Sequence, residues 1–184
     1  MIKLLITDFD GTLVDTFEAN FRAYERAFKE ANVPFSRTDY ERCFGFRFDR
    51  FMAEMNIQDS TVTTDIREAK SRYYPEYFDL IRVNQPLVDL LASFRCQDGC
   101  KTAVASTARR KNLMNVLSYH HLEGMFDLIV AGEDVEKGKP SPEIYLAVMS
   151  QLKVSPVETI IFEDSEVGVE AAQASGAQCI KMRL

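Results

Sequence analysis

The sequence predicts an α/β fold in which helices sandwich a parallel sheet, with a small all-helical segment inserted after the first strand. Three observations predict it. Residues 4–7 form an apolar run without polar alternation, which is typical of a strand buried on both faces. Residues 15–80 show helical periodicity and no convincing strand. From residue 87, short apolar runs alternate with helical segments, which favours repeated units of strand and helix with right-handed crossovers.

The inserted segment is expected to contain several helices. From residue 17 to 31, apolar side chains recur at helical spacing with Glu and Arg between them, and Pro34 ends this helix. The other helices of the segment are expected over 38–43, 48–55 and 63–78.

The remainder of the chain is expected to alternate between strand and helix. After a helix over 87–94, strands are expected over 101–105, 126–130, 159–162 and 178–182, and helices over 109–119, 143–152 and 167–174. Together with the first strand they form a Rossmann-like sheet. We therefore expect residues 1–14 and 81–184 to form the α/β core domain and residues 15–80 to form the helical insertion.

Composition narrows the class of function. The formal net charge is −6, with 28 acidic and 22 basic residues, which argues against a nucleic-acid partner that would be bound through Lys and Arg. The four cysteines are scattered, so we expect free thiols in a reducing compartment. The first apolar run is too short for a signal peptide, and no run has the length of a membrane span. These features predict a cytoplasmic protein without a membrane partner.

Two acidic residues follow the first predicted strand. Asp8 lies where the strand emerges, and Asp10 lies two residues later. In an extended segment these two side chains point the same way and share one pocket. Because paired carboxylates repel, either a cation lies between them or one of them holds a proton, and both arrangements are typical of a chemical site.

Polar residues also follow the other predicted strands. In an open parallel sheet, function gathers at the carboxyl ends of the strands. Ser106 and Thr107 follow the second core strand, Lys137 and Lys139 lie in the loop after the third, and Glu163-Asp164 follows the fourth. A carboxylate nucleophile, hydroxyls, a lysine and a second acid pair are the groups needed to move a phosphoryl group.

Four motifs in this order resemble those of the haloacid dehalogenase-like hydrolase superfamily. They are Asp-Phe-Asp-Gly-Thr-Leu-Val-Asp-Thr at 8–16, Ser106, Gly-Lys-Pro-Ser-Pro at 138–142 and Glu-Asp-Ser-Glu-Val-Gly at 163–168. The likeness spans residues 4–181. The inserted segment resembles the small helical cap of the branch that contains phosphoglycolate phosphatase and β-phosphoglucomutase.

The resemblance implies a role for each matching residue. Asp8 would be the nucleophile that forms an aspartyl-phosphate, and Asp10 the general acid and base. Ser106 would hydrogen-bond a phosphoryl oxygen, and Lys139, rather than nearby Lys137, would supply a fixed positive charge beside Asp8. The residues expected to contact substrate are Gly11, Thr12, Thr107, Ala108 and, in the helical insertion, Arg47.

The resemblance also implies Mg²⁺, a hard cation that prefers oxygen ligands. Asp8 and Asp164 are the expected side-chain ligands, joined by the main-chain carbonyl of Asp10. Glu163 is expected either to bind the ion through water or to orient one of its ligands.

These inferences predict a Mg²⁺-dependent phosphatase that acts on a small phosphorylated metabolite as a monomer or homodimer. A β-phosphoglucomutase-like phosphotransferase is the first alternative. Mutases of the family carry a histidine four residues after the threonine that is Thr16 here, whereas this sequence has Asn20, which favours hydrolysis. A protein that binds phosphate or metal without catalysis is the alternative from another class. The intact motifs count against it.

Overall fold

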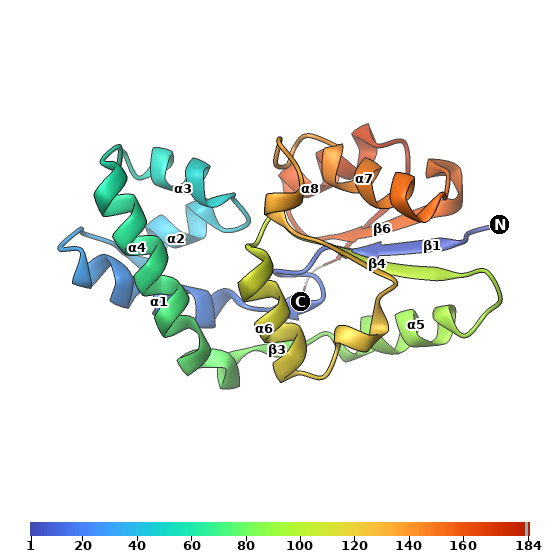
Figure 1. Ribbon diagram of the computed structural model, residues 1–184, viewed down its shortest axis with the longest axis horizontal. Coiled ribbons are helices and arrows are strands. Elements are labelled where there is room, and N and C mark those ends of the chain that lie inside the picture. The colour runs from blue at the N-terminus through green and yellow to red at the C-terminus, as the bar shows by residue number, and fades with distance from the viewer. Residues whose placement is uncertain (183) are drawn as a thin grey trace. The chain divides into compact units, whose positions relative to one another are not determined.

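The computed structural model describes residues 1–182 and 184, and these form two compact units (Figure 1). One unit comprises Met1–Asp15 and Arg82–Leu184, and the other comprises Thr16–Ile81. Both boundaries between the units lie one residue further along the chain than the sequence predicts, at 15/16 and 81/82 instead of 14/15 and 80/81. We call the first the core unit and the second the helical unit.

The core unit is built on a five-stranded parallel sheet with the order β5-β4-β1-β6-β7. The strands are β1 (Leu4–Thr7), β4 (Lys101–Ala105), β5 (Leu128–Val130), β6 (Thr159–Glu163) and β7 (Gln178–Lys181). β1 is the central strand, and Ile6 is in register with Ala103 on one side and Ile161 on the other. All four residues of β1 are buried, as a strand covered on both faces requires. The predicted fold class is confirmed.

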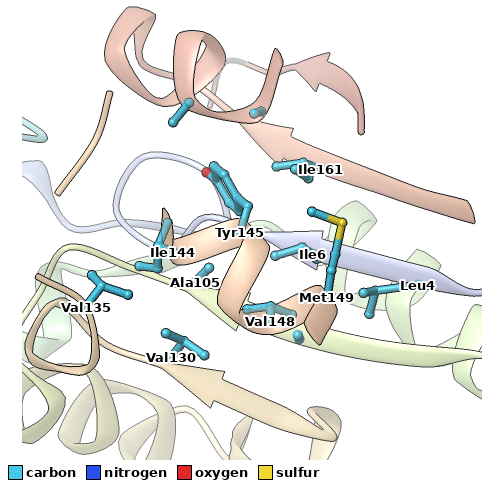
Figure 2. Close-up of a cluster of buried hydrophobic side chains, with 13 residues drawn as sticks. Leu4, Ile6, Ala105, Val130, Val135, Ile144, Tyr145, Val148, Met149 and Ile161 are labelled. Atoms are coloured by element: carbon cyan, nitrogen blue, oxygen red, sulfur yellow. The ribbon is translucent and has the colours of Figure 1, made fainter. Parts of the chain in front are cut away.

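Helices cover both faces of this sheet. α7 (Glu143–Leu152) and α8 (Glu166–Ala174) lie on one face, and α5 (Gln85–Arg95) and α6 (Arg110–Tyr119) lie on the other (Figure 1). Under α7, aliphatic side chains of the three central strands form a core with Tyr145 and Val148 (Figure 2). Short 3-10 helices occupy the loops at Glu123–Met125, Gly132–Asp134 and Pro156–Glu158.

The helical unit contains α1 (Phe17–Glu30), α2 (Arg37–Cys43), α3 (Phe48–Glu54), α4 (Ser60–Tyr73) and the 3-10 helix η1 (Tyr74–Leu80). Its core is aromatic. Phe28 stacks on Phe35 with ring centroids 4.2 Å apart, and Phe51 and Tyr40 complete the cluster. The single helix expected over 63–78 is divided into α4 and η1, because Pro75 cannot continue the α-helical hydrogen bonds.

A two-stranded antiparallel ribbon, not expected from the sequence, joins β2 (Val14–Asp15) to β3 (Arg82–Val83). Two residues are too few to show a strand periodicity, which is why the pattern of the sequence did not reveal it. The ribbon brings together the two points at which the chain leaves and re-enters the core unit.

Two further properties bear on the sequence-based expectations. All four cysteines carry free thiols. Within residues 1–182 and 184, no helix has both the length and the apolar character needed to cross a membrane.

Candidate active site

The site lies at the carboxyl ends of β1 and β6. β1 ends at Thr7, so Asp8 is the first residue beyond it, and its backbone N–H donates to the carbonyl of Phe162 over 2.9 Å. β6 ends at Glu163, and Asp164 follows. Because the two strands are adjacent and parallel, three carboxylates from distant parts of the sequence meet at one edge of the sheet.

Asp8 and Asp10 do not belong to one extended segment, contrary to the sequence-based argument. The chain turns directly after Asp8, where Leu13 and Val14 both donate backbone hydrogen bonds to the carbonyl of Phe9. The alternation of a strand therefore does not fix the direction of these two side chains. Asp10 is half-buried and forms an isolated bridge with Val14. Glu163 and Asp164 form an acidic group with Asp8.

Lys139 lies between two of the carboxylates. Its ammonium is 2.5 Å from Asp8 Oδ1 and 2.5 Å from Glu163 Oε1, and its side chain is only 3% exposed. Charge-assisted hydrogen bonds of this kind are strong when water is excluded. An ammonium has three N–H donors, and Asp8 and Glu163 take two of them.

Glu163 is fully buried and accepts hydrogen bonds from five donors. Its Oε1 accepts from Lys139 and from the hydroxyl of Tyr145, the latter over 2.6 Å. Its Oε2 accepts from the backbone N–H groups of Asp164 and Ser165 and from the Ser165 hydroxyl. A carboxylate offers about four lone-pair directions, so these donors occupy Glu163 completely. Glu163 is therefore arranged to orient Lys139 rather than to bind a metal ion directly.

Asp164 is held by the loop that follows β1. The Thr12 hydroxyl donates to Asp164 Oδ1 over 3.2 Å. Gly11 has φ of +90°, and a Cβ at this position would lie 2.3 Å from Asp164 Oδ2. Only glycine allows both the left-handed backbone and this close approach.

Asp8 and Asp164 can hold a metal ion, with Glu163 beside them in the same acidic cluster. Asp8, Glu163 and Asp164 each offer an oxygen, and these atoms all lie within 4.8 Å of one another. Together with the ammonium of Lys139 they give the cluster a formal charge of −2. The donors are all hard oxygens, which fits a divalent cation such as Mg²⁺ in both charge and chemistry.

The pKa values in the cluster reflect first the burial of its members and then this excess of negative charge. Burial raises the pKa of Asp8 well above its ordinary value; Lys139 opposes the shift, whereas Glu163 and Asp164 add to it. Burial, followed by repulsion from Glu163, raises the pKa of Asp164 to about 6. Burial by itself lowers the pKa of Lys139, but attraction to Asp8, Tyr145 and Glu163, together with the hydrogen bond to Asp8, outweighs burial and raises the pKa well above its ordinary value. A bound cation would relieve the repulsion between these acids.

Ser106 follows β4 and is 1% exposed. Its Oγ accepts the backbone N–H of Ala108 over 3.0 Å, and a hydroxyl that accepts keeps its own proton to donate. The helix expected over 109–119 is α6, which begins at Arg110, one residue later than expected, so Thr107 and Ala108 precede the helix. The N–H of Ala108 is engaged by Ser106, and the Thr107 carbonyl packs against Gly132.

Arg47 belongs to the helical unit. It is the N-cap residue of α3 and its Nε lies 3.6 Å from Asp49 Oδ1. A role for Arg47 in substrate binding stays a prediction.

Sequence reasoning missed three residues that support the cluster: Tyr145, Gly168 and Asn84. Tyr145 donates to Glu163, and Gly168 packs against its carboxylate. Asn84 donates from Nδ2 to the carbonyl of Thr12 over 2.9 Å, and its Oδ1 accepts the N–H of Leu87 at the start of α5. Of the three, only Gly168 carries a signal in the sequence, because a glycine inside a predicted helix indicates a close approach, and this signal was not used. The other two contacts depend on segments far apart in the sequence.

The fold and this site define a Rossmann-like α/β protein with a lysine and three carboxylates at the carboxyl edge of its sheet. The chain belongs to the haloacid dehalogenase-like hydrolase family, whose model matches residues 5–182. It is 32% identical to the phosphorylated carbohydrates phosphatase of Thermotoga maritima over 97% of this chain and 84% of that protein. It is 29% identical to the β-phosphoglucomutase of Bacillus subtilis over 95% and 80% of the two chains.

A solved structure shares the architecture. The crystal structure of CbbY from Rhodobacter sphaeroides in complex with phosphate superposes with a TM-score of 0.87 and 27% sequence identity. The match covers 100% of this chain and 87% of that one. Both units of the present chain thus have counterparts within that match.

Proposed function

We propose that the protein is a Mg²⁺-dependent phosphatase that hydrolyses a small phosphorylated carbohydrate through an aspartyl-phosphate on Asp8. The observation that carries the proposal is the position of the Lys139 ammonium, which contacts both Asp8 and Glu163 while Asp164 lies in the same acidic cluster. A carboxylate nucleophile beside a fixed cation and a divalent-metal site suits attack on a phosphoryl group.

Mg²⁺ would be held by the side chains of Asp8 and Asp164 and by the main-chain carbonyl of Asp10. When bound, it would neutralise charge on the phosphoryl oxygens and hold the substrate in line with Asp8. Glu163, whose lone pairs are occupied, would orient Lys139 and contribute no direct bond to the ion.

The first step would be attack of Asp8 on phosphorus. An oxygen of Asp8 forms a bond to phosphorus as the bond from phosphorus to the ester oxygen breaks, and Asp10 gives its proton to the leaving oxygen. The third N–H of Lys139 and the hydroxyl of Ser106 would donate to the equatorial phosphoryl oxygens. Gly11 and Thr12, with the backbone around Thr107 and Ala108, would line the remaining side of the phosphoryl group.

The second step would release phosphate. Asp10, now ionised, takes a proton from water as the water oxygen bonds to phosphorus, and the bond from phosphorus to Asp8 breaks. The enzyme returns to its starting state, with Asp8 ionised and Asp10 protonated. Two moderate barriers thus replace one high barrier.

The names of the relatives support a phosphorylated carbohydrate as substrate, since a phosphatase and a mutase acting on such compounds both match most of this chain. The helical unit would serve as a cap that excludes water and selects the sugar, with Arg47 as its candidate contact. Asn20 stands where the mutases of the family carry histidine, which favours transfer of the phosphoryl group to water.

The test is phosphate release from p-nitrophenyl phosphate and from a panel of sugar phosphates, with and without Mg²⁺. We expect turnover that needs Mg²⁺, and we expect Asp8→Asn to reduce it to background while the thermal unfolding transition persists. Turnover by Asp8→Asn close to that of the wild type would exclude the aspartyl-phosphate. Conversion of β-glucose 1-phosphate to glucose 6-phosphate with little phosphate release would identify a mutase. A folded wild type that is inactive on every substrate would identify a binding protein.

A further inference from the structure

Tyr145 is a buried polar group next to the acidic cluster that the mechanism above does not use. It lies in the first turns of α7 and is 0% exposed. Figure 2 shows its ring among the aliphatic side chains of the sheet core, with the phenolic oxygen directed away from Ile6 and Met149. The ring is thus part of the hydrophobic core, whereas the hydroxyl points out of this core.

The hydroxyl has one specific acceptor. It donates to Glu163 Oε1 over 2.6 Å, the same oxygen that accepts from Lys139. The Tyr145 ring centroid is 5.1 Å from Lys139 Nζ, within the range of a cation–π contact. Tyr145 therefore touches both members of the buried Lys139–Glu163 ion pair.

This arrangement fixes the direction of Glu163. A carboxylate held through one oxygen can still rotate about its χ3 torsion, which is broad and roughly two-fold. Here Tyr145 holds Oε1, and the backbone at 164–165 holds Oε2. The oxygen presented to Lys139 is consequently fixed, and with it the line from Lys139 to Asp8.

We propose that Tyr145 is a positioning residue for phosphoryl transfer: by holding Glu163 Oε1, it keeps the Lys139 ammonium aligned on Asp8 and on the phosphoryl oxygens. The proposal rests on the proposed function, since it assigns Tyr145 to the same site. Tyr145 itself does not touch the reacting atoms.

The test is Tyr145→Phe, which keeps the ring in the core and removes only the hydroxyl. We expect kcat for p-nitrophenyl phosphate to fall about tenfold, because small misalignments of catalytic groups are costly, while KM rises by less, only several-fold. The matched control is Thr159→Val. Thr159 is also fully buried, lies at the other end of β6, and loses a hydroxyl hydrogen bond to the Ser155 carbonyl. This control is expected to lower Tm without changing kcat.

A double-mutant cycle separates positioning from a general loss of stability. If Tyr145 acts through Glu163, Tyr145→Phe will have little further effect on kcat in a Glu163→Gln background. An unchanged kcat in Tyr145→Phe, or independent effects of the two substitutions, would overturn the proposal.

A second measurement keeps the proposal testable without turnover. Binding of inorganic phosphate in the presence of Mg²⁺, followed by calorimetry, is expected to weaken several-fold in Tyr145→Phe and to be unchanged in Thr159→Val. Should the wild type release no phosphate from any ester, the proposed function fails, and this binding comparison alone decides the role of Tyr145. Equal phosphate affinity in Tyr145→Phe and wild type would then reject it.

Discussion

The α-carbon of Gly168 lies directly against the carboxylate of Glu163. A Cβ built at position 168 would be 2.0 Å from Glu163 Oε1 and 2.1 Å from Oε2. α8 begins at Glu166, so its first turn covers the buried acid that holds Lys139. The absence of a side chain at one helical position thus allows a fully buried carboxylate to sit beneath the helix.

Gly168→Ala is expected to destabilise the protein and to slow turnover. The methyl group must displace either Glu163 or α8, and overpacking of this kind costs about 1–3 kcal/mol of unfolding free energy. Chemical denaturation measures the stability and phosphate release measures the turnover. Gly124→Ala is the matched control, because a Cβ at Gly124 meets no atom within 4 Å. Equal behaviour of the two variants would show that the contact with Glu163 places no constraint on position 168.

Asn84 is expected to link the ribbon of β2 and β3 to the metal site. Its Nδ2 donates a hydrogen bond to the carbonyl of Thr12, and the hydroxyl of Thr12 donates to Asp164. The Oδ1 of Asn84 accepts the N–H of Leu87 and so caps α5. Asn84→Asp keeps an acceptor for the helix cap and loses the donor to Thr12, so we expect weaker Mg²⁺ binding by calorimetry. The added negative charge alone would change the affinity in the opposite direction.

Asn84→Ala separates the two roles of the side chain. It loses both the donor and the helix cap, and loss of an N-cap costs about 1 kcal/mol. We expect Asn84→Ala to bind Mg²⁺ at least as weakly as Asn84→Asp and to unfold at lower denaturant concentration. If Asn84→Asp binds Mg²⁺ with wild-type affinity, the position of Asp164 does not depend on the hydrogen bond from Asn84 to Thr12.

Much of the fold, and the charged residues at the centre of the site, could be predicted because they depend on local sequence patterns. β4 and α7 have the predicted limits, since each is an apolar segment with clear boundaries. Asp8 and Glu163-Asp164 were found because parallel strands bring their carboxyl ends to one edge, and Lys139 was separated from Lys137 by the motif at 138–142.

The partners of these residues were less predictable, because hydrogen bonds between distant segments leave no periodic signal. Tyr145 is read from sequence as one more core aromatic of α7, and only its contact with Glu163 distinguishes it. The contacts that precede α6, which begins one residue after the expected position 109, were unpredictable for a similar reason. The residues after Ser106 form a turn held by the Ser106 hydroxyl, and the N–H of Arg110 donates to the distant Glu133.

Asp164→Asn is expected to have opposite effects on the metal-free and the metal-loaded protein. Without metal, three carboxylates face one ammonium, so removal of one charge relieves repulsion and should raise Tm above that of the wild type in EDTA. A bound ion stabilises by about 2.7 kcal/mol at a concentration 100 times its Kd, so Mg²⁺ should raise the wild-type Tm strongly and the variant's Tm weakly. Scanning calorimetry with EDTA or Mg²⁺ measures both effects.

The control for that comparison is Asp98→Asn, an exposed acid in the turn between α5 and β4. It should leave the response to Mg²⁺ unchanged. An equal Mg²⁺-induced rise of Tm in Asp164→Asn and wild type would remove Asp164 from the set of ligands.

His120 is expected to make stability fall at mildly acidic pH. It follows the last residue of α6, and within the part of the chain that the structure describes its Nε2 is buried without a hydrogen-bond partner. Burial, with a smaller contribution from His121, lowers the pKa of His120 below the ordinary 6.5. The unfolded chain therefore binds a proton at a higher pH than the folded protein does. Stability is complete above pH 6.5 and declines as the pH falls through and below that value.

His120→Phe should remove most of this decline, because it replaces the unpartnered nitrogen with an apolar ring beside Tyr119. Denaturation midpoints measured from pH 8 to pH 5 test it. His121→Asn is the matched control: His121 has φ of +57°, a conformation that asparagine tolerates, and its substitution should leave most of the pH dependence in place. If His120→Phe shows the same decline as the wild type, the acid sensitivity arises elsewhere, because no other change separates the two proteins.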